Sequence, residues 1–248
     1  MRWRLVRGEL LKMRGTPSSW WLFGAALAAV SFGVVLTLAL AEVRPGDDVR
    51  SLASFAGTGG LVAILAGVVS TAGEHRHRTI VASALATPRR TPAYLAQVAS
   101  LGIWGLLLGV AAAALATAIS LPWLAAKGIA LEVSAAQFAA IYLGAIAYTA
   151  GSAALGAGVG ALARNQVAAA VAVFVYLAIL DPTLAALVPA YGRFSLTALG
   201  IALSGGVSGG GGPSAQLLPF WAAAAVYALC AGLVVVAGLV RNARGDLI

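Results

Sequence analysis

The residues best able to do chemistry are concentrated in one stretch, GEHRHRTIVASALATPRRTPAYLAQ, at residues 73–97. Histidine is a common metal ligand and a common general base, so His75 and His77 suggest a metal site or an acid–base centre. They are the only two histidines of the chain, no third ligand accompanies them, and Arg76 between them repels a cation. We therefore expect solvated surface histidines and no metal ion.

Other kinds of catalytic site are also missing from the sequence. Ser152 lies in an apolar run that contains no histidine to serve as its base, and no pair of carboxylates is placed for acid–base work. The glycine-rich stretch 204–214 lacks the Gly-Lys-Ser/Thr that ends a phosphate-binding loop, so we interpret it as a flexible linker. The single cysteine, Cys230, is expected to pack as a small apolar side chain. We predict a protein that is no enzyme and binds no cofactor itself.

Composition points to a membrane. The chain has 248 residues, of which 61% are hydrophobic and 10% charged, whereas soluble domains average roughly 45–50% apolar and about 25% charged residues. Six stretches have about the 20 apolar residues that a spanning helix needs. These are Ser19–Ala41, Leu52–Ala72, Val98–Ala125, Ala135–Ala161, Gln166–Leu180 with some extension, and Leu217–Val240. The predicted fold is a single all-α domain, residues 1–248, with six transmembrane helices.

The distribution of basic residues predicts the orientation. With the N-terminus in the cytoplasm, all but four of the 16 Lys and Arg residues fall on the inner side, as the positive-inside rule requires. The four exceptions are Arg44, Arg50, Lys127 and Arg193. We therefore expect a multi-pass protein of the plasma (inner) membrane with both termini cytoplasmic. This orientation accounts for the net charge of +8 without a nucleic-acid partner.

Two features of the fifth and sixth spans are less regular. Asp181-Pro182 is expected to end the fifth span, so that no span carries a charge well inside it. The stretch Thr183–Ser204 is long enough to cross the membrane, but it contains Pro189 and Arg193. We favour a pair of short re-entrant or interfacial helices on the outer side, within an outer segment 183–214, over a seventh span.

The charged stretch is expected to form a short, rigid helix over Glu74–Ala86. Glu74 and Arg78 are four residues apart, with the acid first, which is the better order for a pair on one helix face. Thr87-Pro88 ends this helix, and Thr91 followed by Pro92 is typical of an N-cap with proline at the first helical position. The pattern favours a docking element, although an ordinary basic loop remains an alternative.

The N-terminal residues 1–16 predict a second cytoplasmic helix, lying in the membrane interface. Its apolar side would consist of Trp3, Val6, Leu10 and Met13, with basic residues flanking it. Thr16-Pro17 ends it, and Trp20 and Trp21 follow where an aromatic belt is expected.

This layout resembles the membrane subunit of a type-2 ATP-binding-cassette (ABC) exporter, the ABC-2 permease family. That family has a glutamate, a basic residue, a threonine, and then leucine and proline followed by arginines between spans two and three. The matching residues here are Glu74, Arg76, Thr79, Leu85, Pro88, Arg89 and Arg90. Gln97 departs from the lysine that is frequent in the family at that position.

The resemblance implies that residues 73–97, which include Arg78, form a coupling helix that docks on a separate ABC ATPase subunit. It also implies that residues 1–16 are an elbow helix and that the short helices between spans five and six are re-entrant. ATP and magnesium would bind to the ATPase subunit. Since six spans are half of a twelve-span exporter, a second permease chain is expected, in a homodimer or a heterodimer.

The expected function is therefore that of a permease subunit for ATP-driven export or efflux. An uncharged interior favours an amphipathic or hydrophobic substrate, such as a drug, an antimicrobial peptide or a lipid-linked molecule, and antibiotic resistance would follow from drug efflux. Phe55, Phe174 and Tyr176 are candidate wall residues of the pathway. The glycine pairs 105/109 and 156/160 would let helices approach closely. The alternative is a secondary transporter or channel that works without an ATPase.

Overall fold

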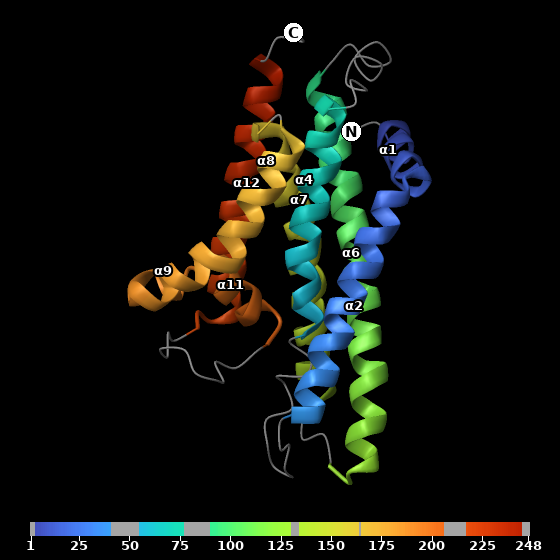
Figure 1. Ribbon diagram of the computed structural model, residues 1–248, viewed down its shortest axis with the longest axis vertical. Coiled ribbons are helices and arrows are strands. Elements are labelled where there is room, and N and C mark those ends of the chain that lie inside the picture. The colour runs from blue at the N-terminus through green and yellow to red at the C-terminus, as the bar shows by residue number, and fades with distance from the viewer. Residues whose placement is uncertain are drawn as a thin grey trace.

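The computed structural model describes residues 3–40, 55–76, 90–129, 134–163, 165–205 and 217–244, and every regular element in these ranges is a helix (Figure 1). The long helices are α2 (Pro17–Leu40), α4 (Gly59–Arg76), α6 (Arg90–Ala126), α7 (Ala135–Ala163) and α12 (Phe220–Arg244). The shorter elements are α1 (Trp3–Gly15), the 3₁₀ turn η1 (Phe55–Thr58), α8 (Gln166–Val175), the π-helical turn η2 (Tyr176–Leu180), α9 (Asp181–Leu187), α10 (Pro189–Gly192) and α11 (Leu196–Leu203).

Five helices of the described chain are long and apolar enough to span a membrane. They are Pro17–Leu40, Thr91–Ala126, Ala135–Ala163, Gln166–Leu187 and Phe220–Ala243. The protein is therefore an all-helical, multi-pass membrane protein. The predicted second span, Leu52–Ala72, corresponds to α4, whose apolar part is only Gly59–Gly73 because residues 55–58 form a 3₁₀ turn.

The fifth span does not end where the sequence predicted. The helix continues through Asp181-Pro182 as far as Leu187, with a π-helical turn just before the proline. Pro182 lies at the first turn of α9, the part of a helix where proline is best tolerated. Asp181, which was expected at the end of the span, therefore lies inside this longer helix, and its exposed fraction is 0%.

In the described part of the predicted outer segment, α9, which continues the fifth helix, is followed by the short helices α10 and α11. After α9, the extended residue Val188 leads into α10, and Ser195 caps α11 by accepting a hydrogen bond from the Ala198 N–H at 3.0 Å. Figure 1 shows α9 turning aside from the direction of α8 and α11 lying beside α12. The remainder of the predicted linker, residues 206–214, lies outside the described residues.

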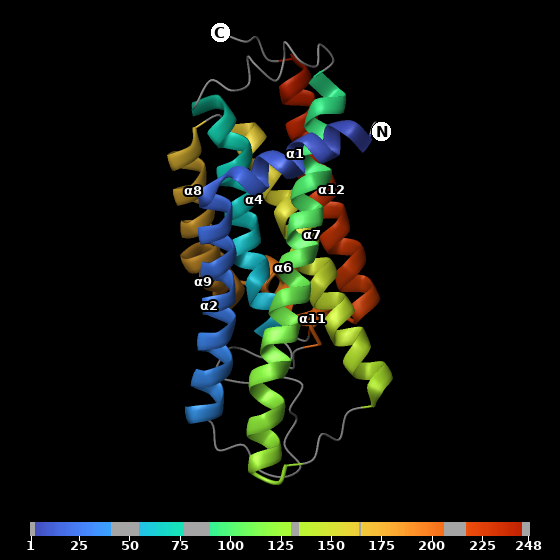
Figure 2. The same ribbon diagram turned by 90° about the vertical axis from the view of Figure 1, so that its right-hand side faces the viewer.

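Both ends of the charged stretch lie at one end of the bundle. In Figures 1 and 2, α1, the end of α4, the start of α6 and the last turn of α12 are all at the same end, which we call the α1 end. Helix α1 crosses the bundle there, and of the four predicted apolar residues Val6 is buried, whereas Trp3 is 65% exposed. Helix α6 begins at Arg90, so the predicted N-cap Thr91 is already helical and the helix starts two residues before the predicted first helical residue, Pro92.

Helix α7 lies at the centre of the fold because glycines let its neighbours approach its backbone. A Cβ at Gly156 would overlap the Ile64 carbonyl of α4, and a Cβ at Gly160 would lie 2.9 Å from the Val68 carbonyl. On α6, a Cβ at Gly105 would lie 2.7 Å from the Thr149 carbonyl of α7. The predicted role of both glycine pairs in close helix packing is confirmed.

We predict that Gly156→Ala lowers the thermal unfolding midpoint of the protein in detergent. The new methyl group must separate α4 from α7, and such overpacking costs about 1–3 kcal/mol. Gly232→Ala on α12 is the matched control, because nothing lies within 4 Å of a Cβ there. An unchanged midpoint for Gly156→Ala would contradict the close approach of these two helices.

Candidate functional site

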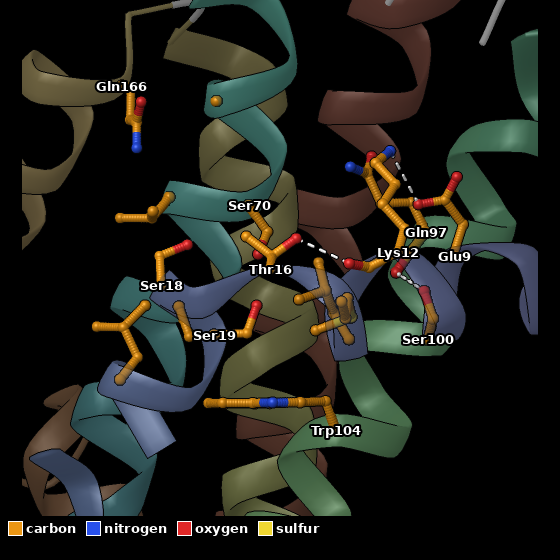
Figure 3. A pocket seen from close by; sticks show the side chains of 16 residues that line it. Glu9, Lys12, Thr16, Ser18, Ser19, Ser70, Gln97, Ser100, Trp104 and Gln166 are labelled. Atoms are coloured by element: carbon orange, nitrogen blue, oxygen red, sulfur yellow. Dashed lines mark hydrogen bonds and ion pairs between the residues drawn. The ribbon is translucent and has the colours of Figure 1, made fainter. Parts of the chain in front are cut away.

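A cavity of about 320 Å³ lies at the α1 end, where it is lined by residues of α1, α2, α4, α6 and α8. Its lining combines polar and apolar groups and comprises Glu9, Lys12, Met13, Thr16, Ser18, Ser19, Leu22, Ala66, Val69, Ser70, Gly73, Gln97, Ser100, Leu101, Trp104 and Gln166 (Figure 3). Gly73 and Gln97 are the first and last residues of the charged stretch identified in the sequence. The two ends of that stretch therefore meet at one cavity.

Hydrogen bonds fix the corner where α1 joins α2. The Thr16 hydroxyl donates to the Lys12 carbonyl at 2.7 Å, and the Trp20 indole N–H donates to the Arg14 carbonyl at 3.0 Å. These bonds satisfy carbonyls that the end of α1 would otherwise leave unpaired. As a result, the wall that α1 contributes to the cavity is held against the bundle.

The charged groups of the cavity lining neutralise each other. Lys12 Nζ lies 3.2 Å from Glu9 Oε2, one helical turn apart on α1. The other polar lining groups are hydroxyls and amides, which carry no charge. The described lining therefore offers hydrogen bonds without a net charge.

Three polar groups of the cavity that are largely buried have no side-chain partner within the described part of the chain. Ser19 and Gln97 are each 8% exposed, and the only hydrogen bonds they make there are through their backbone atoms. The Gln166 Oε1 is buried and likewise accepts no hydrogen bond. By contrast, the Ser100 hydroxyl donates to the Ala96 carbonyl of its own helix at 3.0 Å. Buried polar groups are rarely left unpaired, so the Gln166 Oε1 requires a ligand or water, and the Ser19 and Gln97 side chains are available to bond to one.

An aromatic ring forms the apolar side of the cavity. Figure 3 shows the indole of Trp104 edge-on, with a flat face turned toward the region of Thr16 and Ser19. Phe23 holds the ring by an edge-to-face contact, with 5.6 Å between the centroids and 81° between the planes. The cavity thus presents hydrogen-bonding groups opposite a fixed aromatic face.

A second polar cluster surrounds Asp181, far from the cavity in the sequence. The Tyr191 hydroxyl donates to Oδ1 at 2.6 Å, and the N–H groups of Leu196 and Thr197 donate to Oδ1 and Oδ2 at 3.2 and 3.1 Å. The carboxylate therefore caps the N-terminus of α11, where a negative charge is favourable. Burial and the hydrogen bond to Asp181 raise the pKa of Tyr191, so this phenol stays protonated and donates at neutral pH.

Most of the predicted coupling residues cannot be placed. Glu74 and Arg76 belong to the last turn of α4 and Arg90 begins α6, but only their backbones are described. Arg78, Thr79, Leu85, Pro88 and Arg89 lie outside the described residues. Their predicted role therefore stays a prediction.

Of the predicted wall residues, Tyr176 lines a described cavity. Phe174 is 60% exposed on α8, and the side chain of Phe55 is not among the described ones. Tyr176 lines a separate apolar cavity of about 240 Å³ beside Ile64 and Leu155, and its hydroxyl lies 2.9 Å from that of Tyr191. Sequence reasoning missed the cavity at the α1 end, although Gln97 was conspicuous there as an uncharged polar residue at the start of an apolar run.

Comparison of the sequence with known proteins identifies no relative. No known protein-family model matches the chain, and no curated protein matches it either. The described residues contain no group of three His, Cys, Asp or Glu side chains that could hold a metal ion. The geometry of the cavity favours binding, through hydroxyls, amides and an aromatic face.

We predict that Asp181→Ala destabilises the protein more than Tyr176→Phe does. The first change leaves a phenol and two backbone N–H groups without their acceptor, and each unsatisfied buried group costs about 1–3 kcal/mol. The second change removes the Tyr176 hydroxyl, which lies 3.4 Å from Asp181 Oδ1 and also contacts the Tyr191 hydroxyl, and it leaves the other donors of Asp181 in place. Thermal unfolding in detergent measures both, and equal midpoints would show that Asp181 does not hold α11.

Proposed function

We propose that this chain is the membrane-embedded permease subunit of an ATP-driven type-2 ABC exporter, with both termini in the cytoplasm. Two such chains, or this chain and a homologue, would work with two separate ATPase subunits. The substrate class is an amphipathic or hydrophobic molecule. Support comes from the resemblance of residues 73–97 to the coupling segment of that family, together with the helical, apolar architecture.

One observation carries the proposal further than the resemblance alone. The two ends of the charged stretch, Gly73 on α4 and Gln97 on α6, line the same cavity as α1. A force on this stretch would therefore reach α1, α4 and α6 at one place. From there, the glycine-mediated contact of α4 with α7 would carry the displacement to the centre of the bundle. A segment that transmits force from an ATPase subunit to the helices needs such a common point of attachment.

The alternative, a secondary transporter or channel, would need no motor. Ion coupling usually relies on ionisable residues inside the membrane. The one such residue identified here, Asp181, has its carboxylate oxygens occupied by hydrogen bonds that cap α11. This structural use of the carboxylate favours the ATP-driven proposal.

We predict that the tagged chain co-purifies with an ABC ATPase and that Glu74→Ala combined with Arg78→Ala abolishes transport-linked ATP hydrolysis. The control is Arg50→Ala, which removes a basic residue from the predicted outer side. Co-purification in which no ATPase appears, together with unaltered transport by the double variant, would contradict the proposal.

We also predict the orientation of the chain. In a Cys230→Ala background, Ser134→Cys at the start of α7 should react with a membrane-impermeant maleimide added to intact cells. Gly8→Cys on α1 should react only after the cells are permeabilised. Both positions are exposed, so accessibility within the protein does not limit either reaction. Labelling of Gly8→Cys in intact cells would reverse the topology.

A further inference from the structure

We propose that the cavity at the α1 end binds the uncharged, hydroxyl-bearing head group of an amphiphile, such as a glycolipid. This inference concerns binding and does not depend on the ATP-driven function. It commits to a ligand chemistry, a glycoside head with an apolar tail, and to the residues that recognise it. Ser19, Gln97 and Gln166 would donate and accept the hydrogen bonds, and Trp104 would pack against the head group.

The unpaired polar groups are the first reason. Ser19 and Gln97 are more than nine-tenths buried, line the cavity and have side chains without a partner in the described chain. Gln166 lines the same cavity (Figure 3), and its Oε1 is buried without a donor. A hydroxyl both donates and accepts, as do serine and the two ends of a primary amide. A polyhydroxylated head group therefore has the donors and acceptors that these side chains need.

The charge of the lining selects against ionic head groups. Among the described side chains that line the cavity, the charged ones are Glu9 and Lys12, which form an ion pair at 3.2 Å. An anionic or cationic head group would have to lose its hydration without gaining an unpaired counter-charge, which is costly. An uncharged head group exchanges hydrogen bonds with water for hydrogen bonds with protein at little cost.

The size and position of the cavity favour an amphiphile. A volume of about 320 Å³ is at the lower end of small-molecule sites, so it accommodates a head group but not two acyl chains. Leu22, Val69 and Leu101 line the cavity beside the polar groups. The exposed indoles of Trp20 and Trp21 lie on the adjoining turn of α2, as is typical of the level where head groups meet acyl chains. The tail can then remain in the membrane.

The aromatic face adds selectivity for a ring. The Trp104 indole presents a flat face to the cavity and is held in place by Phe23. The C–H groups on one face of a pyranose pack well against such a surface, while the hydroxyls at the ring edge remain free to bond. A linear head group of the same polarity would use the hydroxyls and amides but not the ring.

The test uses the full-length protein in phosphatidylcholine nanodiscs. Each sample contains the same minor fraction of monoglucosyl diacylglycerol, phosphatidylethanolamine or phosphatidylglycerol, all with identical acyl chains. Native mass spectrometry then counts the lipids that each released chain retains. We expect one retained glucolipid per chain, in preference to the other two lipids. Preferential retention of a charged lipid, or no lipid retained, which would indicate that water fills the cavity, overturns the proposal.

Variants assign the retention to this cavity. Ser19→Ala combined with Gln97→Leu removes two hydrogen-bonding groups and should lower glucolipid retention about tenfold. Ser120→Ala on α6 is the control, because Ser120 is also 8% exposed but its hydroxyl donates to the Ala116 carbonyl of its own helix. Thermal midpoints show whether each variant is folded, and Ser19→Ala alone replaces the double variant if the latter is not. Equal retention in wild type and the folded variant contradicts the assignment.

A competition experiment distinguishes a membrane lipid from a soluble sugar. Octyl β-glucoside below its micellar concentration should displace the bound glucolipid, whereas methyl β-glucoside at the same concentration should not. Equal displacement by both would mean that the sugar alone is recognised and that the amphiphile part of the proposal is wrong.

Discussion

The fold depends on the close approach of α4 to α7. Apolar side chains gain little by burial against one another when the solvent is lipid, so helices in a membrane associate through close packing and hydrogen bonds. Gly67, Gly156 and Gly160 provide this packing, since a Cβ at any of them would meet backbone atoms of the facing helix. Buried hydroxyls add direction: Tyr227 on α12 lies 2.6 Å from Ser152 on α7 and donates to the Tyr148 carbonyl. The α4–α7 contact thus sets the position of the helix ends that form the cavity.

Hydrogen bonds hold the two polar regions of the bundle in place. At the α1 end, α4 and α6 bring Gly73 and Gln97 to one cavity, which α1 closes through the bonds at Thr16 and Trp20. In the α8–α11 region, Asp181 ties the helix that follows the π-turn to the N-terminus of α11. Both regions rest on polar interactions within an apolar bundle, where an unpaired group is expensive.

The sequence predicted the architecture well where periodicity and composition decide it. The long apolar helices, the N-terminal helix, the short helices after residue 181 and the role of the glycine pairs were all expected. It was wrong at Asp181-Pro182, because a proline in the first turn after a π-helical turn does not stop a helix. It also missed the cavity, since Ser19, Gln97 and Gln166 come from three helices and converge only in the tertiary structure. The predicted pathway residues are aromatic residues within spans. The residue type alone does not indicate which helix face borders a cavity.

The central claim is that residues 73–97 transmit force between a separate ATPase and the helices rooted at the α1 end. The most direct measurement is to place a photo-reactive amino acid at His77 and irradiate living cells that express the protein. The account predicts a cross-linked adduct whose second component is an ATPase with a phosphate-binding loop, identified by mass spectrometry. Cross-links to lipid or to this chain alone, with no ATPase adduct, would contradict it.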